Sequence, residues 1–123
     1  MNRRKNEEEL VANFRQRVEK IVNELLERNG IEIYGNLKIE IANMDALALI
    51  KRNKIYVNIQ AMKYPKYVLK YIIAHELAHL VVKRHTKRFW EIVKRIYPQY
   101  QRGKDELLKR LKRSFRKKHH LKS

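Results

Sequence analysis

Hydrophobic residues recur at helical spacing through the first part of the chain. Between residues 7 and 28, five of them fall three or four positions apart, with charged residues between them: Leu10, Phe14, Val18, Ile21 and Leu25. An apolar stripe of this period predicts an amphipathic helix with one face turned to a core. Asn29 and Gly30 would end it. We expect this helix to back a more buried helix, an assignment that the pattern favours over a surface helix that binds a partner.

Apolar and polar residues then alternate, which is the pattern of half-buried strands. The alternation covers residues 31–42, with Gly35 and Asn36 as a bulge or turn. Shorter runs at 46–51 and 54–59 predict two more strands, joined by a turn at Arg52 and Asn53. We therefore expect a small three-stranded sheet, and the sequence leaves open which strand lies at its edge.

Helical spacing returns after these strands. A largely apolar segment at 64–83 has Pro65 in its first turn, where a residue without an amide hydrogen is tolerated. A second helix is predicted at 86–97, with Thr86 as its N-cap and its aromatic residues in the core, and a last amphipathic helix at 105–115 follows Gly103. The pattern predicts one compact α+β domain over residues 1–115 and a basic tail over 116–123.

Two histidines and a glutamate interrupt the apolar helix with the spacing His-Glu-x-x-His. His75 and His79 lie four positions apart on one helical face, and Glu76 borders the same patch. A catalytic zinc usually takes three protein ligands and leaves one position for water, whose pKa falls to about 7. Glu76 could accept a proton from that water and return it to a leaving amine. A buried helix whose polar groups only satisfy one another is disfavoured, because burying three ionisable groups without a metal is costly.

A third ligand is available a few residues later. His85 lies just beyond the predicted end of the helix, in a short turn that could fold its imidazole back toward the other two. The alternatives are that His85 is a solvated surface histidine, and that Glu91, about one helical turn further on, is the third ligand.

Several tyrosines are candidates for stabilising a tetrahedral oxyanion by a hydrogen bond. They are Tyr64, Tyr67, Tyr97 and Tyr100. An ordinary packing role is more common for each of them, because tyrosines often bury the ring and leave the hydroxyl in water. The sequence therefore assigns none of them to catalysis.

Composition adds two constraints. The chain has no cysteine, which excludes disulfides and thiolate zinc sites and predicts a cytoplasmic protein. No apolar run reaches the roughly eighteen residues of a membrane span, and the N-terminus does not look like a secretory signal.

Thirty Lys and Arg residues against thirteen Asp and Glu give a formal net charge of +17, which predicts a polyanionic partner. High Lys, Arg, Glu and Ile contents are also typical of a thermophile.

Residues from about Met44 to Leu111 resemble the YgjP-like metallopeptidases, close relatives of the SprT-like proteins and of the archaeal minigluzincins. The residues that carry the resemblance are Lys54-Ile-Tyr-Val-Asn58, Pro65, His75-Glu-Leu-Ala-His-Leu80, His85-Thr-x-x-Phe-Trp90, Pro98 and Tyr100. The resemblance implies a zincin fold, a Zn²⁺ ion on His75, His79 and His85, and Glu76 as general base and acid. It also implies an edge strand that holds an extended substrate by main-chain hydrogen bonds.

The chain departs from the resemblance at one loop. The bacterial family usually carries Trp-Gly-Ser before its second strand, whereas this chain has Asp45-Ala-Leu-Ala48. A cleft-wall role for that loop therefore does not carry over from the resemblance.

The basic C-terminal segment admits three interpretations. It is a solvated end, a nucleic-acid contact through phosphates, or a self-inhibitory segment. In the last case this tail, or that of a neighbouring chain in a homodimer, lies in the cleft, as the resemblance to zymogen-like minigluzincins suggests.

We expect a zinc-dependent metallopeptidase that hydrolyses peptide bonds and is latent or self-inhibited. The alternative is a nucleic-acid-binding protein, or a protease recruited to DNA, in which the basic surface dominates and the zinc site is structural.

Overall fold

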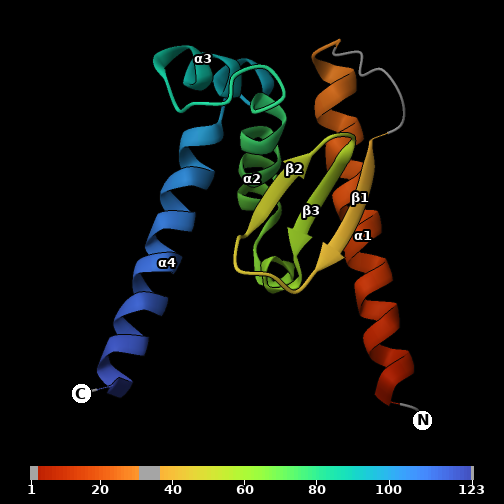
Figure 1. The fold of residues 1–123 in the computed structure, drawn as a ribbon, viewed down its shortest axis with the longest axis vertical. Helices are drawn as coiled ribbons and strands as arrows, with labels where there is room; N and C mark the ends of the chain where they lie inside the picture. The colour runs from red at the N-terminus through yellow and green to blue at the C-terminus, as the bar shows by residue number, and fades with distance from the viewer. Residues whose placement is uncertain (1–2, 31–36, 123) are drawn as a thin grey trace.

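The computed structural model describes residues 3–30 and 37–122, and it has the α+β architecture that the sequence predicts (Figure 1). Residues 31–36, which the sequence assigns to the start of the first strand, lie outside the described part. The elements in chain order are α1 (Arg3–Arg28), β1 (Lys38–Ala42), β2 (Ala48–Lys51), β3 (Lys54–Asn58), the 3-10 helix η1 (Ile59–Lys63), α2 (Lys66–Ala78), α3 (Lys87–Ile96) and α4 (Tyr100–Lys122).

The sheet has the strand order β1-β3-β2. β3 is central, parallel to β1 and antiparallel to β2. Its residues Ile55 and Val57 are fully buried, as expected for a strand with neighbours on both sides. The edge strand β1 contacts α1 and the edge strand β2 contacts α2, so the sheet lies beside both helices (Figure 1).

Helix α1 backs the domain as the sequence predicts. Phe14, Val18, Ile21 and Leu25 are buried, but Leu10 is 54% exposed, so the stripe meets the core one turn later than its spacing suggests. The Arg17 guanidinium donates hydrogen bonds to the carbonyl oxygens of Met62, in η1, and of Tyr64, the residue that follows η1. These bonds tie α1 to the segment that leads into α2.

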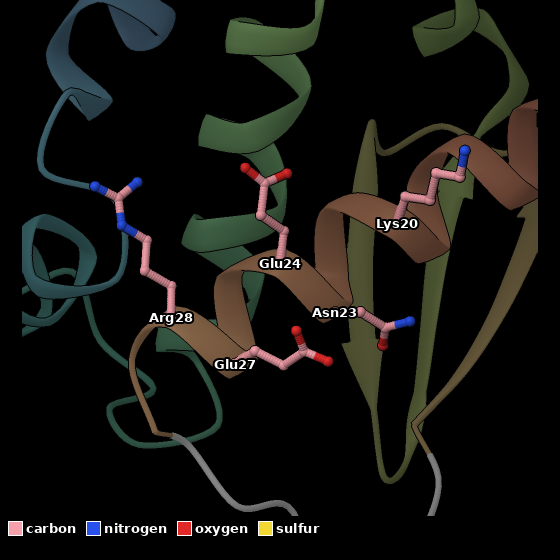
Figure 2. Close-up of a pocket in the computed structure, with 5 residues that line it drawn as sticks. All are labelled: Lys20, Asn23, Glu24, Glu27 and Arg28. Carbon is pink, nitrogen blue, oxygen red and sulfur yellow. The ribbon is translucent and has the colours of Figure 1, made fainter.

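An ion-pair cluster joins α1 to α2. Glu24 accepts a hydrogen bond from Lys70 at 2.9 Å and lies 3.6 Å from the ammonium of Lys66. The hydrogen bond from Lys70 lowers the pKa of Glu24, so this carboxylate stays charged. Figure 2 shows the side chains of α1 around it, with the Glu24 carboxylate directed toward α2. These ion pairs contribute little to stability because the Glu24 side chain is 42% exposed, but they orient the two helices.

Helix α2 is the most deeply buried element, and it ends earlier than its apolar pattern suggests. The sequence predicts a helix to residue 83, whereas α2 stops at Ala78. The amides of Val81 and Val82 both donate to the Ala78 carbonyl, which closes a tight turn in place of further helix. At the other end Pro65 is the N-cap, and its carbonyl accepts from the amides of the first turn.

Helix α4 begins before Gly103 and passes through it, which corrects the prediction that the helix starts after this glycine. A Cβ atom at Gly103 would lie 2.5 Å from the Tyr67 carbonyl oxygen and 2.8 Å from the Tyr71 Cβ. Glycine is therefore required by the close approach of α4 to α2. The helix continues to Lys122, across the residues that the sequence treats as a tail. No described helix is both long and apolar enough to cross a membrane.

We predict that Gly103→Ala destabilises the protein, although alanine favours helix by about 1 kcal/mol over glycine. Overpacking costs about 1–3 kcal/mol, and the upper part of that range applies because the nearest atom is a backbone oxygen. The net loss in the free energy of unfolding should therefore be about 1–2 kcal/mol. Urea unfolding followed by circular dichroism measures it. Ser114→Ala, at an exposed position of the same helix, should change stability little. A Gly103→Ala protein as stable as the parent would contradict the packing argument.

Candidate metal centre

The carbonyl end of α2 presents two of the imidazoles. His75 lies in the last turn of the helix and His79 is its C-cap. Their rings are 4.8 Å apart, as four-residue spacing on a helix allows. Because the C-terminal end of a helix carries partial negative charge, a cation is favoured there by about 0.3–1 kcal/mol.

The turn after α2 returns His85 to the same place. Thr86, the next residue, is the N-cap of α3, and its hydroxyl oxygen accepts a hydrogen bond from the Phe89 amide at 3.4 Å. His85 is thus held between the end of one helix and the start of the next. Its Nε2 atom lies 3.1 Å from Nε2 of His79. The structure therefore brings together the three histidines that the sequence singles out, His75, His79 and His85.

The geometry of the trio suits a metal ion. The ring of His85 lies 5.0 Å from that of His75 and 4.9 Å from that of His79, and one ligand nitrogen from each of the three lies within 4.8 Å of the others. A tetrahedral zinc with Zn–N bonds of about 2.0–2.1 Å would separate two nitrogens by about 3.3 Å, so a small inward movement would complete the site. The chemistry fits as well, because three neutral imidazoles are a usual zinc ligand set.

The tautomer of His79 is set by the backbone. Its Nδ1 lies 3.2 Å from the Val82 carbonyl oxygen, which can only accept, so Nδ1 carries the proton. The lone pair is then on Nε2, the atom that faces His85. A carbonyl partner of this kind both fixes the ring and increases its basicity as a ligand.

Aromatic residues of α3 support the three rings. Phe89 is fully buried and packs 4.6–5.1 Å from each imidazole. Trp90 lies 6.0 Å from the ring of His75 and 6.2 Å from that of His85. The prediction that these aromatics belong to the packed interior is confirmed for Phe89, while Trp90 is half-buried.

Although His85 is exposed overall, partial loss of water around its ring and the two neighbouring imidazoles lower its pKa. Since a metal binds the neutral imidazole, a lowered pKa keeps His85 in its ligating form at neutral pH.

Glu76 faces a cleft beside the imidazoles. It is one of the few buried polar residues, with 9% exposure, and its Oε1 lies 3.4 Å from Nδ1 of His75. The cleft has a volume of about 210 Å³ and lies between β2, α2 and α4. Its lining residues are Leu47, Ala48, Tyr71, Ile72, His75, Glu76 and Leu107.

The loop at which the chain departs from the family resemblance does line this cleft. Asn58, which is buried, holds the loop in place by donating to the carbonyls of Met44 and Ala46 at 2.6 and 3.1 Å. Its Oδ1 accepts from the Gln60 amide and so caps η1. The sequence analysis names Asn58 only as the end of a matching strand and does not foresee this role.

Tyr71 is the cleft residue that sequence reasoning missed. Its ring lies 6.0 Å from that of His75, edge to face, and stacks 6.4 Å from the ring of Tyr100. Burial, with Tyr100 and Glu76 nearby, raises the pKa of Tyr71 to about 12, so the hydroxyl stays protonated. Within the described part of the chain this hydroxyl has no hydrogen-bond partner, yet it is not sealed from solvent. The available signal was its position four residues before His75, on the same helical face.

The alternative ligand Glu91 is exposed and is not part of the histidine group. Among the described residues no second group of metal ligands occurs. A larger hollow of about 550 Å³ lies along α1, lined by Lys20, Asn23, Glu24, Glu27 and Arg28 (Figure 2). It is a polar surface in which Glu24 is already paired with lysines, and it offers no comparable chemistry.

Comparison with known proteins gives two kinds of match. The model of the YgjP-like metallopeptidase domain matches residues 2–110. The crystal structure of the metallopeptidase zymogen of Pyrococcus abyssi abylysin resembles this structure with a TM-score of 0.66 and 22% identity, over 77% of this chain and 95% of that chain. The zymogen of Methanocaldococcus jannaschii jannalysin gives a TM-score of 0.64 and 24% identity, over 76% and 96%. No curated protein matches. The two structures confirm the fold.

We predict that replacing His85, but not Glu91, removes zinc binding. His85→Ala should weaken zinc binding by more than about 100-fold, because even outer partners of a ligand are worth 10–100-fold. Glu91→Ala should bind like the parent protein. Titration calorimetry with zinc, at matched protein folding, measures both affinities. Zinc loss in Glu91→Ala alone would identify the glutamate as the ligand instead.

Proposed function

Since the chain belongs to the YgjP-like metallopeptidase family, we propose that it is a zinc-dependent endopeptidase whose metal is held by His75, His79 and His85. The observation that carries the proposal is the convergence of three imidazoles next to a buried carboxylate that faces a cleft. Zinc bound there supplies a Lewis acid that polarises a peptide carbonyl and makes water acidic enough to attack it near neutral pH.

Glu76 is the general base and acid in this proposal. It follows a ligand directly, borders the cleft and is largely screened from bulk water. Its carboxylate takes a proton from the attacking water and delivers it to the amine that leaves. The nearby imidazole of His75 keeps the carboxylate oriented, at 3.4 Å between Nδ1 and Oε1.

β2 is the strand that we expect to hold substrate. It lies at the edge of the sheet, and its residue Ala48 lines the cleft with Glu76. A peptide in extended form could add to this edge by main-chain hydrogen bonds, which ask little of its side chains. The other edge strand, β1, packs beside α1 and has no residue in the cleft.

The hydroxyl of Tyr71 is placed to act on the substrate carbonyl. It is a protonated donor beside His75 and Glu76, with no competing acceptor in the described chain. A donor of this kind stabilises the negative charge that develops on the carbonyl oxygen.

The proposal includes a latent state. Leu107 of α4 closes one side of the cleft, and the contact at Gly103 holds the helix against α2. We therefore expect low activity on folded proteins and higher activity on short unstructured peptides. The rival function, a nucleic-acid-binding module with a structural zinc, has no need of the carboxylate.

We predict that Glu76→Gln leaves zinc bound and lowers turnover by about 10²–10⁴-fold, the usual contribution of general acid–base catalysis. Hydrolysis of a mixture of quenched fluorescent peptides measures turnover, and zinc content is measured on the same samples. Glu91→Gln, an exposed carboxylate outside the site, is the matched control and should behave as the parent. Equal turnover in parent and Glu76→Gln would refute the assignment, and zinc binding with no turnover in any variant would favour the rival.

Tyr71→Phe should lower kcat by about 10²–10³-fold, as loss of one oxyanion donor does, while KM and zinc content change little. Tyr100→Phe provides the control, because Tyr100 stacks on Tyr71 but does not line the cleft. A phenylalanine variant with unchanged kcat would show that the Tyr71 hydroxyl only packs.

A further inference from the structure

The positive charge of this chain is concentrated at one end of its sequence. Residues 1–36 carry seven basic and seven acidic residues, whereas residues 83–123 carry sixteen basic and three acidic ones. The C-terminal third therefore holds thirteen of the seventeen net positive charges. A protein that needed charge only for solubility or heat resistance would have no reason to gather one sign at one end.

Most of this segment forms α3 and α4, and α4 lies on the side of the molecule away from α1 (Figure 1). The charge on α1 is balanced by its glutamates, and Glu24 pairs with lysines of α2. α4 has a different arrangement, because acidic residues occur in it only at positions 105 and 106. The basic residues of this helix are therefore largely without acidic neighbours.

Three exposed basic residues of α4 form a stripe. Arg102, Lys109 and Arg113 are spaced by seven and four residues, which places them within about 40° of one another around a helix. None of the three has an ion-pair partner in the described chain. From first to last they span about 16 Å along the helix axis, at about 1.5 Å per residue.

Two other basic residues of α4 are already engaged, and the exposed Lys112 lies about 60° or more around the helix from the stripe. Arg110 bonds to Glu106 at 2.9 Å, and the ammonium of Lys104 lies 3.9 Å from the ring of Trp90. At the start of the stripe, Arg102 stacks over the ring of Tyr67 at 4.3 Å, which holds its guanidinium in position. One end of the stripe is thus anchored to α2.

We propose that the stripe Arg102, Lys109 and Arg113 binds nucleic acid through its phosphate backbone. Duplex DNA carries about one negative charge per 1.7 Å of axis, so a rod of this length faces several phosphates. Binding of this kind requires no base-specific side chains.

The placement of apolar residues favours nucleic acid over an anionic membrane. The exposed leucines of α4, Leu108 and Leu111, are 46% and 39% exposed. Leu111 lies about 160° or more around the helix from every residue of the stripe, and Leu108 lies about 100° or more from them. A membrane-bound amphipathic helix buries its apolar face in the lipid, which would turn this stripe away from the headgroups. A polyanion in solution can reach the stripe without any such conflict.

The test uses the full chain and a fluorescently labelled 20-base-pair DNA of mixed sequence, followed by anisotropy at several salt concentrations. Lys109→Gln with Arg113→Gln should weaken binding about tenfold or more and reduce the slope of log affinity against log salt by about 2. Both residues are exposed, so circular dichroism should show an unchanged fold.

The matched control removes the same charge elsewhere. Arg15→Gln with Lys20→Gln lowers the net charge by two on the exposed surface of α1. It should leave affinity and salt slope near those of the parent protein. Equal losses in the two double variants would show that only net charge matters and would overturn the proposal, as would no loss in either.

Vesicles containing phosphatidylserine form the last arm. Sedimentation of the parent protein with these vesicles, together with no binding to the DNA, would mean that the surface is a membrane contact and would also overturn the proposal. None of these readouts depends on zinc or on peptide hydrolysis, so they test the nucleic-acid surface independently of the proposed peptidase function.

Discussion

The convergence of three imidazoles at the carbonyl end of a buried helix is the constraint on which the rest of the structure depends. Their ligand nitrogens lie within 4.8 Å of one another, with Phe89 packed against all three rings. Lone pairs that face one another at this range are unfavourable unless a proton or a cation is shared between them. The early end of α2 at Ala78 and the cap at Thr86 both serve this arrangement, because together they return His85 to the helix.

α2 therefore carries both apolar residues of the core and ionisable residues of the site. Its apolar side chains form the centre of the core, while His75 and Glu76 in its last turns face a cleft. The elements around α2 accommodate both kinds of residue. α1 packs against one side, and the edge strand β2 and the helix α4 approach the polar side closely enough to leave a cleft of about 210 Å³.

α4 joins the site to the charged surface. Near its start it approaches α2 so closely that only glycine fits at position 103, and Tyr100 stacks on both Tyr71 and Trp90. Further along, one face carries Leu107 into the cleft while another presents basic residues to solvent. A polyanion bound to that outer face would therefore touch the same rigid element that limits the cleft.

Sequence alone determined the features that depend on neighbours in the chain. The period of a helix places His75 and His79 on one face with Glu76 beside them, and alternation marks β2 and β3 to within two residues. The cap at Thr86 was also a local matter, and the family followed from the motif.

Tertiary structure decided what depends on residues distant in sequence. Packing of α4 on α2 explains Gly103, the strand order made β2 the edge that borders the cleft, and the turn after Ala78 brought His85, and not Glu91, to the other imidazoles. No local pattern encodes these juxtapositions, because they arise only when the apolar faces of separate elements are buried against one another.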